Sequence, residues 1–168
     1  PMHDMHDGWG WRVIQARLQR IQKEGFEIED VDVHRIHQRF VSLECRLVLI
    51  FNIDWFQPMK NSPHSTGAIY VTICNNPRAI RFRRGETILV AVLPGPKEPP
   101  KEAINYVLEP LIRAAIALED GRKFAVYGMD ERCSVHAHLH LNASDLPASR
   151  KTGGLLSGSS QEFTCHRC

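Results

Sequence analysis

The sequence predicts an α/β fold built on a mixed sheet, preceded by an N-terminal helix. Three short apolar segments follow one another with turn residues between them, which is typical of an antiparallel meander. An amphipathic segment comes next and indicates a helix, and a fourth apolar strand follows it. A helix between strands can carry the chain across the sheet, so we expect the fourth strand beside the first and parallel to it.

The first strand, predicted at about 45–54, contains the apolar run Leu47-Val-Leu-Ile-Phe51. Branched and aromatic residues in such a run are typical of a strand that is buried on both faces. The strand ends at Asp54, shortly before Pro58. A carboxylate at the end of a buried strand is costly unless it is paired or coordinated, which makes Asp54 a candidate site residue. Its alternative role is to cap the turn that leads to Pro58.

The second and third strands are predicted at 67–74 and 86–93, and each is followed by a turn that contains proline. Pro99-Pro100 opens the crossover helix, and Gly121 is a suitable residue to end it. Pro110 lies inside the helix and removes one backbone hydrogen bond, so we expect a kink near it.

The fourth strand is predicted at 135–145 and ends at a second aspartate, Asp145. Alternation places Asp145 on the apolar face of this strand, and His136, His138 and His140 on the other face. Three histidines on one face can bind a metal, but the sequence places no carboxylate or cysteine beside them there. We therefore interpret them as a polar, partly exposed strand face.

The N-terminal segment gives weaker patterns. Apolar residues from Trp11 to Ile21 recur at helical spacing, and Gly25 stops the pattern, which predicts a helix of about four turns. Residues 26–40 are interpreted as a mostly solvated connector. Four N-terminal side chains can bind a metal, although a frayed end is the favoured interpretation: His3, Asp4, His6 and Asp7. Four arginines form a short basic loop that is solvated or contacts phosphate: Arg78, Arg81, Arg83 and Arg84.

Composition limits the functional classes. The 168 residues suffice for one domain with a core, and the net charge of +2 gives no strong basic field, so any DNA contact must come from local patches. No apolar run approaches the ~20 residues of a membrane span, and no N-terminal signal pattern is present, which favours an intracellular protein without membrane partners. The chain starts at Pro1 and stops within an apparent motif, which suggests a fragment.

The cysteines do not form the pattern of a disulfide framework. The count of five is odd, and two of them stand as Cys165-x-x-Cys168, a spacing that suits one zinc ion. A reducing compartment is therefore expected. Cys45, Cys74 and Cys133 lie on or beside predicted strands, and we interpret them as small core residues.

The two aspartates belong together if the first and fourth strands are parallel neighbours. Adjacent strands lie ~4.8 Å apart, so Asp54 and Asp145 would face each other closely at the strand ends. Two unpaired carboxylates at that range repel, and a divalent cation relieves the repulsion. Nucleases and phosphoryl-transfer enzymes hold two metal ions with such carboxylates. The sequence therefore predicts a ribonuclease-H-like layout with a divalent metal site at Asp54 and Asp145.

Several segments carry a resemblance to a known family. They are Phe51-Asn-Ile-Asp-Trp-Phe-Gln-Pro58, Thr66-Gly-Ala-Ile-Tyr-Val-Thr-Ile-Cys-Asn-Asn-Pro77, Ile88-Leu-Val-Ala-Val-Leu-Pro-Gly-Pro-Lys-Glu-Pro99, Ser144-Asp-Leu-Pro-Ala-Ser-Arg-Lys151, Cys165-His-Arg-Cys168, and Asp4-Met-His-Asp-Gly8 with Trp11. In these segments the chain resembles the CACTA (En/Spm-type) transposases, especially the fungal members. The resemblance covers 51–168 well and 1–50 weakly.

The resemblance implies a cut-and-paste DNA transposase of the DDE type, which would act in the nucleus on transposon ends and could oligomerise. Asp54 matches the first acid of the family and Asp145 the second, while the third lies beyond Cys168. The resemblance implies that Asp54 and Asp145 bind Mg²⁺ or Mn²⁺. Cys165 and Cys168 would form half of a zinc site. The implied organisation is a helical and linker segment at 1–44, part of a ribonuclease-H-like core at 45–160, and the start of a zinc-binding segment at 161–168. The fourth strand departs from the family's usual apolar strand through its three histidines.

Two other classes remain open: a non-catalytic, DNA-contacting remnant of a transposase, and a zinc-stabilised interaction module without a DNA role. Binding of divalent ions distinguishes the non-catalytic remnant from an enzyme. Salt-dependent DNA binding distinguishes that remnant from the interaction module. Without the third acid we expect no DNA cleavage by this chain. Glu98, in a proline-rich turn, and Glu109, beside Pro110, are poor substitutes.

Overall fold

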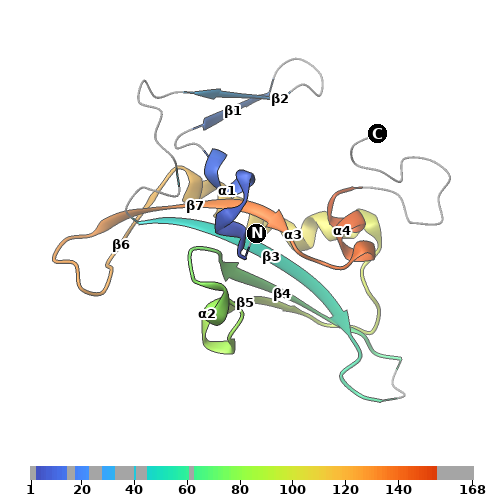
Figure 1. Cartoon of the computed structure of the whole chain (residues 1–168). Helices are drawn as coiled ribbons and strands as arrows, with labels where there is room; N and C mark the ends of the chain where they lie inside the picture. The colour runs from blue at the N-terminus through green and yellow to red at the C-terminus, as the bar shows by residue number, and fades with distance from the viewer. Residues whose placement is uncertain are drawn as a thin grey trace.

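A computed structural model of the chain describes residues 3–14, 18–22, 28–32, 40, 45–60 and 63–154. Its centre is a five-stranded mixed sheet with the strand order β5-β4-β3-β7-β6 (Figure 1). The strands of this sheet are β3 (Arg46–Phe56), β4 (Thr66–Ile73), β5 (Thr87–Leu93), β6 (Arg122–Phe124) and β7 (Cys133–Asn142). The two helices that follow the meander and the last strand are α3 (Lys101–Glu119) and α4 (Leu146–Thr152). The sequence-based prediction of an α/β fold with a mixed sheet is confirmed.

The predicted meander is present, since β4 pairs antiparallel with both β3 and β5. Most side chains of β4 are buried, as expected for a central strand of branched and small residues. Gly67 is needed in this strand because a Cβ atom there would lie 2.6 Å from the Trp55 ring of β3. Between β4 and β5 stand two short helices, α2 (Arg78–Arg81) and η3 (Arg84–Glu86), where the sequence predicted a basic loop.

The crossover is also as predicted. Helix α3 leads from the meander toward β7, which pairs parallel with β3 from Arg46↔His136 to Phe51↔Asn142, with one register shift after Leu49. Gly121 follows the helix with φ +95°, a conformation that glycine adopts without a steric cost. Among the described residues, no helix has the length and the apolar character that crossing a membrane would require.

Apolar clusters cover the middle of the sheet on both faces, while most side chains of β5 are exposed. On one face, α3 and α4 pack on β3 and β4 in a cluster of seven buried residues: Phe51, Ile53, Ile69, Val71, Ile104, Leu108 and Ala148. On the other face, the N-terminal segment covers a second cluster: Ile14, Phe40, Val48, Ile50 and Cys74. Complete burial of such a side chain stabilises the fold by about 1.5–3 kcal/mol. The alternating residues of β3 supply both clusters, which explains why this strand has the longest apolar run.

The N-terminal helix was predicted too long. Helix α1 covers only Trp9–Val13, and the residues that continued the helical pattern form strand β1 (Leu18–Gln22). β1 pairs antiparallel with β2 (Ile28–Asp32), which lies within the predicted connector. The prediction was wrong because pairing of β1 with β2 overrides the local helical spacing of these apolar residues.

The prediction of a frayed N-terminus was wrong as well. Asp4 caps the short helix η1 (Met5–Asp7) and forms an ion pair with Arg81, whose side chain is buried. His6 Nε2 lies 2.6 Å from the carbonyl oxygen of Cys74, at the end of β4. These contacts fix the N-terminal segment on the sheet, and they bury one arginine of the segment that was interpreted as a solvated basic loop.

The last elements differ from the prediction in their bounds. Strand β7 ends at Asn142, three residues before Asp145, because the chain then turns into α4, a helix that the sequence did not predict. Strand β3 continues to Phe56, so Asp54 lies inside the strand and not at its end. The short edge strand β6, antiparallel to β7, was not predicted.

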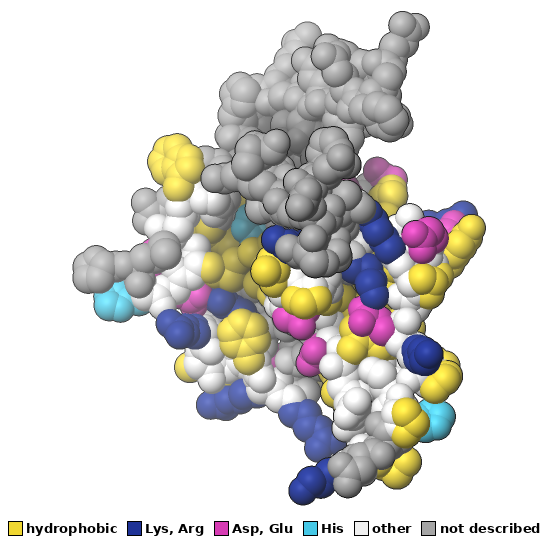
Figure 2. Space-filling view, turned by 90° about the vertical axis from the view of Figure 1, so that its right-hand side faces the viewer, with side chains coloured by type: hydrophobic (Ala, Val, Ile, Leu, Met, Phe, Trp, Pro, Cys, Tyr) yellow, Lys and Arg dark blue, Asp and Glu magenta, His cyan; other side chains and the backbone are white. Residues whose placement is uncertain are grey.

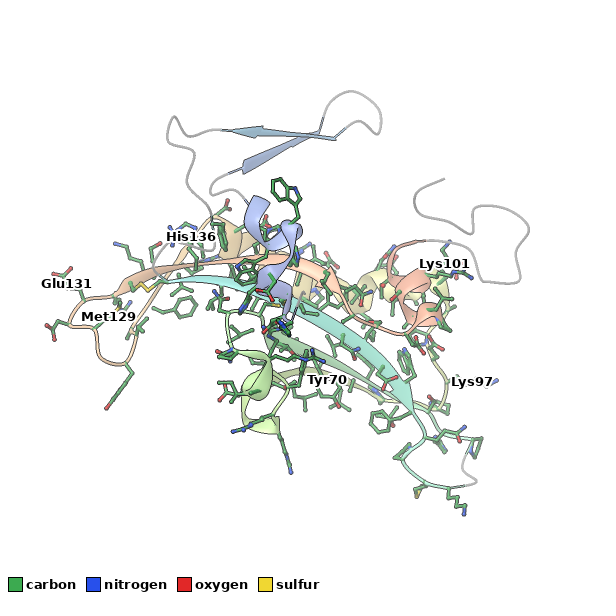
Figure 3. The ribbon with its side chains drawn as sticks, viewed as in Figure 1. Tyr70, Lys97, Lys101, Met129, Glu131 and His136 are labelled. Carbon is green, nitrogen blue, oxygen red and sulfur yellow. A yellow bond between two sulfur atoms is a disulfide. The ribbon has the colours of Figure 1, made fainter. Side chains whose placement is uncertain are left out.

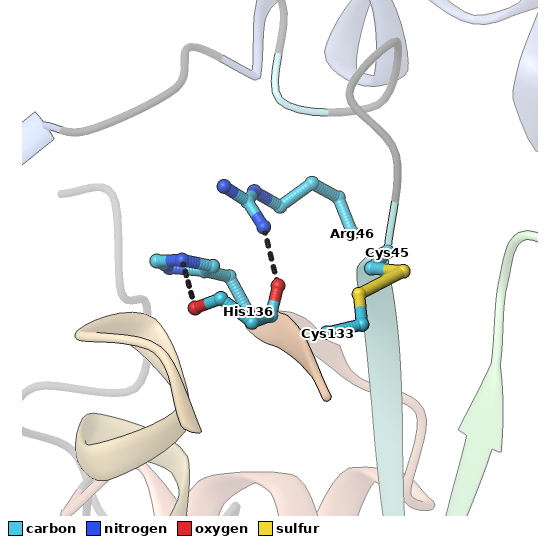
Figure 4. The surroundings of a disulfide bond; sticks show 5 residues. Cys45, Arg46, Cys133 and His136 are labelled. Carbon is cyan, nitrogen blue, oxygen red and sulfur yellow. Dashed lines mark hydrogen bonds between the residues drawn. A yellow bond between two sulfur atoms is a disulfide. The ribbon is translucent and has the colours of Figure 1, made fainter. Parts of the chain in front are cut away.

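Cys45 and Cys133 form a disulfide, which corrects their interpretation as core residues with free thiols (Figure 4). The pair joins the residue before β3 to the first residue of β7, where Arg46 also donates a hydrogen bond to the Ser134 carbonyl at 3.0 Å. Cys74 is a free, fully buried cysteine, as predicted. Cys165 and Cys168 lie outside the described residues, as does the predicted segment 161–168.

Candidate functional site

The two candidate aspartates lie on adjacent parallel strands or directly beyond them. Asp54 is in β3, where it pairs with Ala68 of β4, and its side chain is exposed. Ile53 beside it is only 1% exposed and packs in the core under α3, so alternation puts Asp54 on the opposite face of the sheet. Asp145 is also exposed and follows β7.

Hydrogen bonds continue the register of β3 and β7 beyond their last paired residues. The amide of Ala143 donates to the carbonyl of Phe51 at 2.9 Å, and Asn52 Nδ2 donates to the carbonyl of Ala143 at 2.9 Å. One residue further, the amide of Ile53 donates to Ser144 Oγ at 2.8 Å. The next residues along the two segments are Asp54 and Asp145, so one backbone and two side-chain hydrogen bonds bring both aspartates to the same level of the sheet.

Asp145 has a structural role as the N-cap of α4. Its Oδ1 accepts a hydrogen bond from the amide of Ala148 at 2.9 Å, and its backbone carbonyl accepts one from Ser149. The cap uses one carboxylate oxygen at the start of the helix. The capping role that the sequence considered for Asp54 is therefore found at Asp145.

Three polar residues that the sequence analysis missed surround this turn. Ser144 donates its hydroxyl proton to Asn142 Oδ1, which also accepts from the amide of Ser144 at 3.0 Å. Asn142 Nδ2 donates to Thr152 Oγ1 of α4 at 2.6 Å. Polar residues directly after an apolar strand were the signal in the sequence for this network.

The end of the sheet with α4 lies far from the β6–β7 loop. Lys101, at the start of α3, is beside α4, whereas Met129 and Glu131 mark the opposite end (Figure 3). Between α3 and α4 is a groove of ≈ 580 Å³, whose lining includes Phe51, Leu108 and Asn142. Because Asp54 is on the other face of the sheet, this groove is separate from Asp54, whereas Asp145 caps α4, which forms one wall of the groove.

The three histidines of β7 are partly exposed, as predicted, but a carboxylate does adjoin them. His138 Nδ1 lies 3.3 Å from Glu119 Oε1, and the His138 and His140 rings are 6.0 Å apart. Burial, followed by the charge of His138, lowers the pKa of His140, which favours its neutral form. His136 Nδ1 lies 2.9 Å from the Glu119 carbonyl oxygen (Figure 4). These contacts account for the histidines as part of the fold.

The remaining acids that were considered for the site have other partners. Glu98 pairs with Lys151 of α4, and Glu109 pairs with Arg113 one turn along α3. Within the described part of the chain, no group of three or more His, Cys, Asp or Glu residues is arranged to hold a metal ion. Asp54 and Asp145 can therefore supply only two of the ligands of such an ion.

The surface charge does not indicate a single partner. On the face shown in Figure 2, Lys and Arg side chains lie in several places among hydrophobic and acidic ones. This distribution agrees with the small net charge of +2. No protein-family model matches this chain, and no curated protein matches it.

Proposed function

We propose that this chain carries part of the catalytic core of a DDE-type DNA transposase, with a ribonuclease-H-like fold and with Asp54 and Asp145 as two of its acids. One observation carries the proposal. The parallel pairing of β3 and β7, with the hydrogen bond from the Ile53 amide to Ser144 Oγ, brings the two aspartates to the same level of the sheet. The order of meander, crossover helix and parallel strand supports it, since this is the layout expected for such a core. The segments that resemble CACTA transposases include both aspartates.

The donors at this end of the sheet suit Mg²⁺ or Mn²⁺, which prefer carboxylate oxygens. Asp54 is exposed, and Asp145 keeps one carboxylate oxygen free of its hydrogen bond to Ala148. When bound, such ions stabilise charge on a phosphodiester and lower the pKa of a coordinated water. In this proposal the two aspartates hold the ions: β3 positions Asp54, and the turn from β7 into α4 positions Asp145.

Binding of Mn²⁺ tests the proposal directly, because the electron paramagnetic resonance signal of free Mn²⁺ reports how much is bound. We expect weak binding by the parent chain that Asp54→Asn and Asp145→Asn both abolish. Asn keeps the shape of Asp, and at position 145 it also keeps the helix cap. Asp130→Asn is the matched control, because Asp130 is an exposed aspartate in the loop before β7.

DNA provides the second measurement. We expect DNA binding that weakens with salt, and no nicking of supercoiled plasmid in Mn²⁺, because two acids do not fix two ions for in-line transfer. If Asp54→Asn and Asp145→Asn both bind Mn²⁺ as tightly as the parent chain does, the proposal is contradicted. Absence of any DNA binding would favour an interaction module, the other class that the sequence left open.

A further inference from the structure

We infer that Ser144 is a positioning residue, which holds Asp145 level with Asp54 so that the two carboxylates can share one divalent cation. This inference rests on the function proposed above. It concerns a residue that touches neither the metal nor DNA and acts only through the backbone on both sides of the site.

Ser144 is needed because regular strand pairing ends before the aspartates. The last paired residues of β3 and β7 are Phe51 and Asn142, and a register shift already interrupts the ladder after Leu49. One backbone hydrogen bond, from the Ala143 amide to the Phe51 carbonyl, extends the pairing before the chain turns into α4. At the next level, beside the aspartates, the bond from the Ile53 amide goes to the Ser144 side chain. A side chain must replace the missing backbone hydrogen bonds.

The hydroxyl of Ser144 supplies these hydrogen bonds, once as an acceptor and once as a donor. It accepts the hydrogen bond from the amide of Ile53, the residue before Asp54, at 2.8 Å. It donates its own proton to Asn142 Oδ1. One oxygen atom thus connects the backbone beside the first aspartate to the backbone beside the second, and each aspartate is one peptide away from it.

Two further contacts fix Ser144 itself. Asn142, which accepts from Ser144, donates to Thr152 Oγ1 at 2.6 Å and so links the turn to α4. The carbonyl of Ser144 accepts from Ser149 Oγ at 2.9 Å, again in α4. Because α4 packs through Ala148 on the core under α3, the position of Ser144 is set by the rigid part of the fold. Removing a group that is hydrogen-bonded directly to a metal ligand commonly changes metal affinity by about 10–100-fold. Ser144 acts one peptide away from each aspartate, so we expect the lower end of that range.

The experiment measures Mn²⁺ affinity and thermal unfolding of the full chain in four forms: parent, Ser144→Ala, Ser144→Thr and Ser134→Ala. Ser144→Ala removes the hydroxyl, and Ser144→Thr retains it. Ser134→Ala is the matched control, since Ser134 is near the opposite end of β7, with its Oγ 3.2 Å from His136 Nε2. We expect Ser144→Ala to weaken Mn²⁺ binding about tenfold, Ser144→Thr to restore most of it, and Ser134→Ala to leave it unchanged.

The site variants Asp54→Asn and Asp145→Asn test the proposed metal pair separately from the positioning role of Ser144. If both abolish Mn²⁺ binding but Ser144→Ala binds like the parent, the positioning role is overturned and the proposed function stands. If Ser144→Ala only lowers the unfolding temperature, with unchanged affinity measured well below it, the role of Ser144 is stability alone and the inference is again overturned. Mn²⁺ binding that is indifferent to both aspartates removes the proposed metal pair and this inference with it.

Discussion

Arg81 and Asp4 form an ion pair that joins α2 to the N-terminal segment, with 2.8 Å between Nη1 and Oδ1. A second bond of 3.0 Å between Nη2 and Oδ2 makes the contact bidentate. The guanidinium group is buried, and its Nε also donates to the carbonyl of Asn76 at 2.9 Å. One side chain therefore holds the turn after β4 and the segment that covers the second apolar cluster.

Replacement of Arg81 by methionine should release this segment. The variant leaves the Asp4 carboxylate without its principal partner, and a charge left unpaired destabilises the folded state. We expect a lower urea midpoint of unfolding and faster proteolysis within residues 3–14. The matched control is Arg83→Met, which changes an exposed arginine two positions away. Equal midpoints for the two variants would show that the ion pair does not hold the segment.

The same ion pair makes stability depend on pH in acid. The hydrogen bond from Arg81 is the main cause that lowers the pKa of Asp4 from its ordinary value of 3.8. A carboxyl group whose pKa is lowered by folding stabilises the protein above the unfolded pKa, and this contribution is lost as the pH falls through the folded pKa. We therefore expect the free energy of unfolding to decrease below about pH 3.8. The decrease should be less steep in Asp4→Asn than in the parent, in urea titrations from pH 2 to 6.

The central fold could be predicted from the sequence because local patterns determine it. The branched apolar runs of β3, β4 and β5, bounded by turn residues, favour strands, and a right-handed crossover allows β7 to lie beside β3. The hairpin of β1 and β2 could not be predicted, since the spacing of Leu18 and Ile21 favours a helix, and the pairing of β1 with β2 has no local signal. For the same reason the end of β7 was placed too late: Asn142 to Asp145 continue the alternation of the strand, but their side chains form a turn and a helix cap.

The candidate site was predicted only at the level of topology. Parallel pairing of two strands brings Asp54 and Asp145 to one end of the sheet, and this follows from the element order alone. The contacts of Asn142, Ser144 and Thr152 depend on the turn between β7 and α4 and on side-chain directions, which the sequence does not specify. The pairing of Arg81 with Asp4 links residues 77 positions apart in the sequence and has no local signal.

The disulfide between Cys45 and Cys133 gives a prediction about cysteine labelling. It closes a loop between residues 88 positions apart, and loss of a native disulfide typically costs 2–5 kcal/mol, so we expect Cys133→Ser to be destabilised by roughly this amount. In denaturant without reductant, an alkylating reagent should label Cys74 and spare Cys45 and Cys133. Mass mapping of the labelled peptides measures this, and reductant should expose the pair. Labelling of Cys45 without reductant would contradict the disulfide.

Labelling of the folded protein, without denaturant, gives a separate prediction for Cys74. It is fully buried, and burial raises the pKa of its thiol to about 11. At pH 8 the folded protein therefore keeps Cys74 as the unreactive thiol, and its labelling should begin only when the chain unfolds. Rapid labelling of Cys74 in the folded protein would mean that the N-terminal segment does not cover the second cluster.

The two roles of Asp145 can be separated by two substitutions at this one position. As the N-cap of α4, Asp145 accepts a hydrogen bond from Ala148 at 2.9 Å. Asp145→Ala removes this bond and should cost about 1 kcal/mol of the free energy of unfolding, whereas Asp145→Asn retains a capping oxygen and should cost only a few tenths. Both substitutions remove the carboxylate, so both should abolish Mn²⁺ binding if the metal proposal is correct.

Urea unfolding and Mn²⁺ titration of the two variants then give independent answers. A carboxylate that serves only as a cap predicts that Asp145→Asn resembles the parent in both measurements. A carboxylate that also binds metal predicts normal stability without Mn²⁺ binding in Asp145→Asn, because a neutral amide holds a divalent cation more weakly than a carboxylate does. If Asp145→Asn binds Mn²⁺ as the parent does, Asp145 is a cap alone and the metal pair with Asp54 must be withdrawn.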